Sequence, residues 1–161
     1  MERIQIRPNY YETKLKDGQL KKQEWYDNEG NKHRDNGAAE IIYKRDGDFS
    51  YIGTKKWYKH GTHYKTVTFD QYGTPITERY YAKCDKSYNE YHRLDGPAYI
   101  KYNEDGLIFT QIWYVNGLRH RTDGPAVICY NEDGTIEKES YYLDGKLIKD
   151  TLQYLLLTSS N

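Results

Sequence analysis

Short segments of alternating apolar and polar residues, each closed by a glycine turn, repeat along most of this chain. In segment 126–130 the side chains of Ala126, Ile128 and Tyr130 fall on one face of an extended strand, because successive side chains point to opposite faces. Similar runs rich in Tyr, Ile, Val, Thr and Trp favour strands. No continuous helical period occurs before Asp150. The pattern therefore predicts an all-β chain.

Asp-Gly and Asn-Gly pairs separate these segments and predict tight hairpin turns, because glycine adopts a positive φ without steric cost. The turn glycines recur every 26 to 33 residues, at Gly18, Gly47, Gly73, Gly106 and Gly134. A period in this range indicates a repeat architecture. We expect about five units between residues 17 and 148, each contributing about two strands. Tandem β-hairpins of this kind predict an elongated, curved antiparallel meander sheet.

The two ends of the chain depart from the repeat, and open repeat arrays need capped ends. Residues 1–16 are expected to form an N-terminal cap and residues 149–161 a C-terminal cap. Asp150 is suited to cap a short helix over residues 151–157, with leucines as its apolar face. Residues 82–91 interrupt the period and predict a loop. The whole chain, residues 1–161, is thus predicted to be a single repeat array.

The units share a motif that is complete near the C-terminus and weaker elsewhere. It reads Trp113-Tyr114, Gly117, His120-Arg121 and Asp123-Gly124-Pro125-Ala126, and the preceding unit ends with His92-Arg93 and Asp95-Gly96-Pro97-Ala98. The first unit has Trp25-Tyr26, Gly30 and His33-Arg34, with Asn36-Gly37 in place of Asp-Gly. The second and third units lack the His-Arg-x-Asp-Gly-Pro-Ala element at the expected place. We expect positive φ angles at Gly96 and Gly124, before the prolines.

On these motifs, residues 17 to about 148 resemble the MORN-type repeats, in the variant with a Trp-Tyr, Gly, His-Arg, Asp-Gly-Pro-Ala signature. Such repeats are similar to those of phage, giant-virus and bacterial proteins, including the family labelled YwqK-like antitoxins. The resemblance implies a curved or elongated β-sheet with a binding role and no reaction. The antitoxin-like variant suggests inhibition of a toxin or of a host defence factor.

The repeated histidines do not form a convincing metal or catalytic site. His33, His63, His92 and His120 recur once per unit, so neighbouring copies should lie on the order of 9–10 Å apart across two strands. A zinc ion needs its ligands at about 2 Å. We therefore expect no metal and no cofactor. A His–Asp pair repeated in several units also indicates a structural element, in which the arginine bonds the following aspartate or local carbonyls, rather than an enzyme.

Charge and composition exclude several classes of function and location for this chain. Lys+Arg and Asp+Glu both number 24, whereas a general nucleic-acid binder needs a basic excess to release counterions. No apolar run is long enough to span a bilayer, and no signal-peptide pattern is present at residue 1. Two cysteines, Cys84 and Cys129, lie outside any CxxC motif and are expected to be reduced thiols. We therefore expect a cytoplasmic location.

The expected function is binding of a protein partner by a tyrosine-rich repeat surface. The chain has 19 Tyr, and Tyr, Trp and Arg are enriched at interface hot spots. The candidate binding residues are the turn side chains, which we expect to be exposed at the rim: Arg34, His92, Arg93, His120 and Arg121. Carbohydrate binding, membrane-lipid binding and a structural role in a virion or assembly stay open as alternatives. The sequence leaves the partner, the binding face and the oligomeric state open.

Overall fold

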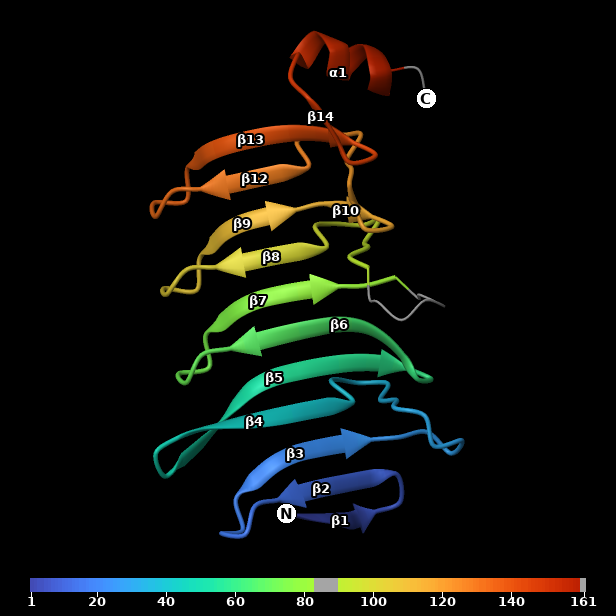
Figure 1. The fold of residues 1–161 in the computed structure, drawn as a ribbon, viewed down its shortest axis with the longest axis vertical. Helices are drawn as coiled ribbons and strands as arrows, with labels where there is room; N and C mark the ends of the chain where they lie inside the picture. The colour runs from blue at the N-terminus through green and yellow to red at the C-terminus, as the bar shows by residue number, and fades with distance from the viewer. Residues whose placement is uncertain (83–89, 160–161) are drawn as a thin grey trace. The chain divides into compact units, whose positions relative to one another are not determined.

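The computed structural model describes residues 1–82 and 90–159 and divides into two compact units, residues 1–76 and 77–161. Each unit is built from antiparallel strands that follow one another as hairpins, and a short helix follows near the C-terminus (Figure 1). The prediction of an all-β hairpin-repeat fold with a short C-terminal helix is therefore confirmed.

In the first unit, consecutive strands pair antiparallel in chain order. These strands are β1 (Glu2–Arg7), β2 (Tyr10–Lys14), β3 (Leu20–Trp25), β4 (Glu40–Asp46), β5 (Phe49–Lys59) and β6 (Thr62–Phe69). The residues predicted to be an N-terminal cap thus include two strands that pair with each other as the first hairpin.

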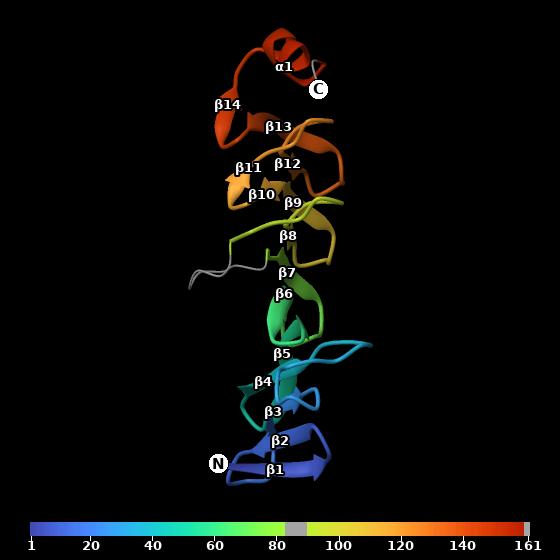
Figure 2. The same ribbon diagram turned by 90° about the vertical axis from the view of Figure 1, so that its right-hand side faces the viewer.

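The second unit continues the same pattern. Strand β7 (Pro75–Tyr80) begins at the end of the first unit and pairs with the next strand in the second. The strands that follow are β8 (Tyr99–Tyr102), β9 (Ile108–Ile112), β12 (Val127–Tyr130), β13 (Ile136–Leu143) and β14 (Lys146–Ile148). Two short strands, β10 (Tyr114–Val115) and β11 (Leu118–Arg119), form a separate hairpin that lies beside β9 and β12 (Figure 2).

The glycine turns are placed where the sequence predicts them. All five of the periodic turn glycines have a positive φ, between 58° at Gly47 and 88° at Gly73. The two-residue turn between β10 and β11 has φ 49° at Asn116 and 79° at Gly117, which is the left-handed pair that a type I′ hairpin turn requires. Asn-Gly therefore fixes the register of this hairpin.

A buried alanine follows the histidine–arginine pair in three of the repeats. Ala39, Ala98 and Ala126 are fully buried, with no exposed surface. Their carbonyls accept hydrogen bonds from the backbone N–H groups of Trp25, Tyr80 and Trp113 at 2.8–2.9 Å. Each buried alanine is thus bonded through the backbone to the aromatic residue of its own repeat.

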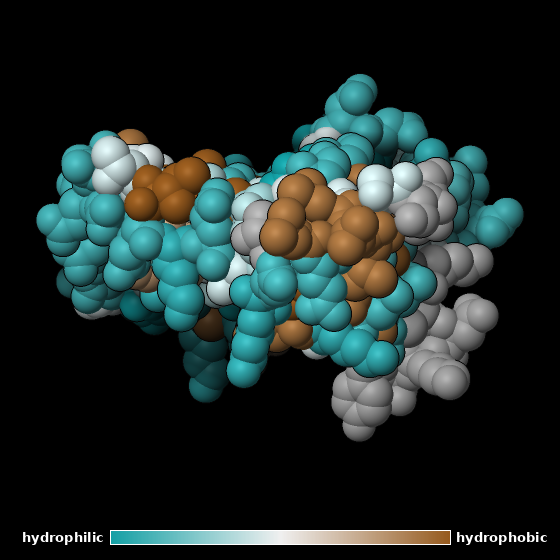
Figure 3. All heavy atoms as spheres, turned by 90° about the horizontal axis from the view of Figure 1, so that it is seen from above, coloured by the Kyte–Doolittle hydropathy of each residue, from teal (hydrophilic) through white to brown (hydrophobic). Residues whose placement is uncertain are grey.

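The C-terminal segment forms helix α1 (Thr151–Thr158), one residue longer than predicted. Asp150 is its N-cap, and its side chain accepts a hydrogen bond from the Leu152 N–H at 2.9 Å. Only Tyr154 is buried among the helix side chains that the structure describes. Leucines are exposed on the outer side of α1, where Figure 3 shows an apolar patch. Cys129 is a free cysteine, whereas Cys84 and most of the predicted loop lie outside the described residues.

Candidate functional site

The histidine of each complete motif joins its own repeat to the turn of the next hairpin. The Nδ1 atom of His92 accepts a hydrogen bond from the N–H of Asn116 at 3.1 Å, and Nδ1 of His120 accepts one from Asp144 at 3.1 Å. Both donors have a positive φ. His33 accepts from the N–H of His60 at 3.2 Å in the same way. The histidines therefore connect neighbouring hairpins within each unit.

The arginine that follows each of these histidines covers the aromatic ring of its own repeat. The guanidinium carbon lies 4.1 Å from the ring centroid in three pairs: Arg34 over Trp25, Arg93 over Tyr80 and Arg121 over Trp113. Such cation–π contacts are stabilising, more so when they are desolvated. The repeated distance indicates that the arginine is a fixed part of the repeat.

The same arginines bond the following aspartates, as the structural interpretation of the motif predicts. The Nε atom of Arg93 donates to Asp95 at 2.7 Å, and that of Arg121 donates to Asp123 at 2.7 Å. Arg121 also donates to the carbonyl of Pro125 at 3.2 Å. In the first repeat, Arg34 likewise donates to the carbonyl four residues on, that of Ala38, at 3.3 Å, and Asn36 stands where the other repeats have the aspartate.

The reason for glycine at positions 96 and 124 differs from our expectation. Neither residue has a positive φ, although Gly37 in the first repeat has φ 118°. A Cβ atom at Gly96 would lie 3.1 Å from Cζ of Arg93, and one at Gly124 would lie 3.1 Å from Cζ of Arg121. Glycine is needed there because the guanidinium packs against the backbone.

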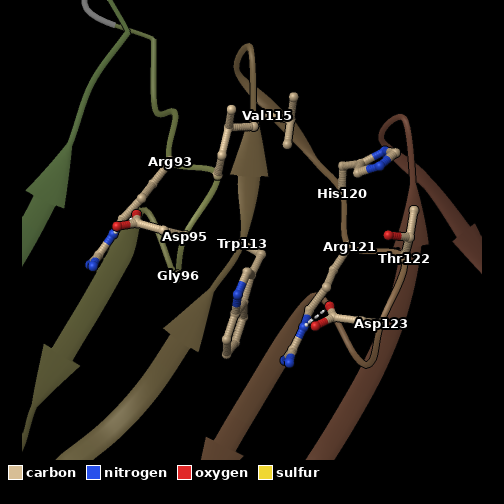
Figure 4. A pocket seen from close by; sticks show the side chains of 10 residues that line it. Arg93, Asp95, Gly96, Trp113, Val115, His120, Arg121, Thr122 and Asp123 are labelled. Atoms are coloured by element: carbon tan, nitrogen blue, oxygen red, sulfur yellow. Dashed lines mark hydrogen bonds and ion pairs between the residues drawn. The ribbon is translucent and has the colours of Figure 1, made fainter.

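Two consecutive copies of this element form the walls of a groove in the second unit. The groove has a volume of about 580 Å³, within the usual range of ligand sites. One wall is the loop that precedes β8, with Arg93, and the other is the loop that precedes β12, with Arg121 (Figure 4). Between them lies Trp113, which follows β9. The lining residues are Arg93, Leu94, Asp95, Gly96, Trp113, Val115, His120, Arg121, Thr122 and Asp123.

The exposed groups of the groove are not the arginines. The Arg93 and Arg121 side chains are 26% and 21% exposed, whereas those of their partners Asp95 and Asp123 are 84% and 80% exposed. The hydrogen bond from each arginine lowers the pKa of its aspartate, so both carboxylates are ionised at neutral pH. Leu94, in one wall, is 79% exposed. The arginines thus support the walls, and the carboxylates and Leu94 face solvent.

Three of the five predicted binding residues, Arg93, His120 and Arg121, come together in this groove. His92 is not among the lining residues, and Arg34 lies in the other unit. Sequence reasoning missed Leu94, Thr122 and Val115 as lining residues. For Leu94 and Thr122 a signal existed, since both occupy the variable position between the arginine and the aspartate of the motif.

The second repeat does not build this element. His63, which the sequence spacing aligned with the other histidines, stacks on Tyr58 with ring centroids 4.8 Å apart and shares a hydrogen bond with the Thr66 hydroxyl at 2.8 Å. Burial lowers its pKa. The ring of Trp57 has Lys65 Nζ at 5.2 Å instead of an arginine. In this repeat β5 and β6 pair directly as a long hairpin, which occupies the place that the motif takes in the other repeats.

The described residues offer neither a metal site nor a membrane-spanning helix. No group of three or more His, Cys, Asp or Glu side chains within residues 1–82 and 90–159 is placed to hold a metal ion. In the same part of the chain, no helix is long and apolar enough to cross a membrane. Comparison of the chain with protein-family models, with curated proteins and with solved structures gave no match.

Proposed function

We propose that this chain is a non-catalytic, MORN-like repeat protein whose groove in the second unit binds a protein partner. The observation that carries the proposal is the groove itself. Its walls are two copies of one repeat element, and an aromatic ring, Trp113, lies between them. Trp, Tyr and Arg are the residue types that dominate binding energy at protein interfaces.

The rigidity of the walls supports a binding role. Each arginine is held by a ring, by a carboxylate and by the packing against glycine, so the groove is formed before any partner arrives. A preformed site loses less conformational entropy on binding. We propose a binding role and not a catalytic one, because the arginines and aspartates of the walls bond each other.

The exposed side chains of the walls support a protein partner over a sugar. Leu94 is 79% exposed and lies beside a charged carboxylate, an arrangement of apolar and charged groups that suits a protein surface. The likeness to antitoxin repeats favours a partner that is a toxin or a host defence factor, in the cytoplasm.

Affinity capture from a lysate of the natural host tests the proposal. Leu94→Glu places a charge on an exposed position of the groove and should leave the fold intact. Leu107→Glu makes the same change at a half-exposed position in the same unit, in a turn that does not line the groove. We expect the wild type and Leu107→Glu to capture one stoichiometric protein, and Leu94→Glu to capture at least tenfold less. Equal capture by all three proteins, or binding of glycans or lipid vesicles with no captured protein, would refute the proposal.

A further inference from the structure

Tyr154 of helix α1 packs into the last repeat of the second unit and bonds the backbone there, as the side chain of a binding partner would. The ring of Tyr154, from α1, packs on the ring of Tyr141 with centroids 4.7 Å apart. Its hydroxyl accepts a hydrogen bond from the Gly124 N–H at 2.9 Å. The same hydroxyl lies within donating distance of the carbonyls of Gly124, at 2.9 Å, and of Arg121, at 3.1 Å. Tyr154 is only 4% exposed.

The three residues that hold Tyr154 have counterparts in the groove. Positions 141, 124 and 121 each lie 28 residues after positions 113, 96 and 93. Trp113, Gly96 and Arg93 all line the groove. Within the part of the chain that the structure describes, the Gly96 N–H and the carbonyls of Gly96 and Arg93 have no hydrogen-bond partner. The groove therefore presents the backbone groups that receive the Tyr154 hydroxyl one repeat later.

The groove differs from the last repeat because Arg121 already covers the ring of Trp113. In the first repeat, a tyrosine ring from the paired strand and an arginine contact the same tryptophan. Trp25 is covered by Arg34 at 4.1 Å and is also stacked with Tyr10, whose ring centroid lies 4.8 Å away. A tryptophan at this repeat position thus contacts a guanidinium and a phenol ring at once.

We propose that the partner inserts a tyrosine side chain into the groove, with its ring against Trp113 and its hydroxyl on the Gly96 N–H and the carbonyls of Gly96 and Arg93. This inference rests on the proposed function and identifies the chemistry of the partner residue. A phenol fits better than a plain phenyl ring because the backbone groups at Gly96 and Arg93 need a group that both accepts and donates.

Titration with two small probes, followed by amide and indole NMR signals, tests the inference on the intact chain. N-acetyl-L-tyrosinamide should shift the Gly96 amide and the Trp113 indole signals, while the Gly106 amide, in a turn outside the groove, stays unchanged. N-acetyl-L-phenylalaninamide lacks the hydroxyl and should bind about fivefold more weakly. Equal responses to the two probes, or no response at Gly96, would overturn the inference.

A variant of the internal tyrosine provides a matched control. Tyr154→Ala vacates the equivalent position in the last repeat, and the tyrosine probe should then shift the Gly124 amide as well. Where this variant does not fold, the wild-type titration decides alone. If the host protein is captured as proposed but the tyrosine probe does not shift the Gly96 amide signal, the inference of an inserted tyrosine is refuted and the proposed function stands. If no protein is captured at all, both are refuted.

Discussion

The two units carry the same repeat but fill one face of their sheets with different chemistry. In the repeats that carry Trp25 and Tyr80, one in each unit, the residue before the aromatic is Glu24 in the first unit and Arg79 in the second. The residue after the buried alanine is Glu40 in the first unit, and Tyr99 takes that position in the second. Similarly, the residue before the motif histidine is Lys32 in one unit and Tyr91 in the other. The same backbone therefore accepts charged residues at these positions in one unit and mainly tyrosines in the other.

In the first unit this face holds a network of ion pairs around two buried carboxylates. The Glu40 side chain is 3% exposed, and its Oε1 atom lies 2.7 Å from Lys22 Nζ and 2.6 Å from Lys32 Nζ. Its Oε2 atom lies 3.3 Å from Lys56 Nζ. Glu24, 7% exposed, shares Lys22 and Lys32 at 2.8 and 3.3 Å. Burial is tolerated here because each carboxylate has several cations.

In the second unit the corresponding face is covered by tyrosine rings. The ring of Tyr91 lies 5.7 Å from Tyr81, 5.9 Å from Tyr99 and 5.2 Å from Tyr114, measured between centroids. These contacts depend on buried area and ring geometry and not on charge. The stability of the first unit should therefore depend more strongly on complete ion pairing and on pH than that of the second, whose arginine–aspartate pairs are largely exposed on the aspartate side.

Removal of a network carboxylate should give the largest effect. Glu40→Ala leaves three lysines close together without their main partner, and breaking a buried ion pair in this way costs about 3–5 kcal/mol. At the same repeat position of the second unit, Tyr99→Phe should cost less than about 1 kcal/mol. Urea denaturation, followed through amide signals of each unit, measures both changes. A loss below 1 kcal/mol for Glu40→Ala would show that the network does not stabilise the first unit.

Acid should also destabilise the first unit more than the second. Burial alone would raise the pKa of Glu40, but hydrogen bonds and attraction from Lys22, Lys32 and Lys56 outweigh it and lower the pKa from 4.5 to about 2. The native state then binds fewer protons than the unfolded state between these values. The stabilisation, about 3 kcal/mol, is complete above pH 4.5 and is lost as the pH falls through 2. Acid titration should therefore weaken the amide signals of the first unit before those of the second.

The contrast between the units also shows what the sequence predicts and what it does not. The hairpin turns at Asp-Gly, the Asp150 helix cap and the arginine–aspartate bond follow from local spacing, and all are confirmed. The burial of Glu24 and Glu40 does not follow, because a charged residue in a strand normally faces solvent. Only the pairing of β3, β4 and β5 brings Lys22 and Lys56 to Glu40. The groove likewise depends on the spacing between two repeats.

The hydroxyl of Tyr154 should contribute more than a typical tyrosine hydroxyl. Tyr154→Phe leaves the backbone groups of Gly124 and Arg121 without their partner in a buried site, at a cost of about 2 kcal/mol. Urea denaturation measures the loss, and faster exchange of the Gly124 amide locates it. The matched variant Tyr72→Phe, at a position that is 85% exposed, should be neutral. Similar values for the two variants would show that α1 is not fixed through this hydroxyl.

Replacement of the glycine at the two equivalent turn positions, Gly124 and Gly37, should destabilise the two units for different physical reasons. Gly124→Ala brings a Cβ atom within 3.1 Å of Arg121 Cζ and should cost about 1 kcal/mol through overpacking. The cost should disappear in an Arg121→Ala background. Gly37→Ala should cost a similar amount through its φ of 118°, and Arg34→Ala should not relieve it. A double-mutant cycle at each position measures the coupling, and equal coupling in both units would refute this distinction.

The smallest effect is expected at Trp25, the tryptophan of the first repeat, whose counterpart in the first repeat of the second unit is Tyr80. The Nε1 atom of Trp25 is buried and has no hydrogen-bond partner among the described residues, which is an unfavourable state for an N–H group. Trp25→Phe removes this N–H together with part of the ring area, and the two effects oppose each other. We expect the free energy of unfolding to change by less than about 1 kcal/mol, whereas Trp25→Ala should cost about 3–5 kcal/mol. Thermal unfolding of both variants measures the difference. A large loss in Trp25→Phe would mean that the indole N–H has a partner, such as a buried water molecule, and that the two repeats are less alike at this position than their shared arginine contact indicates.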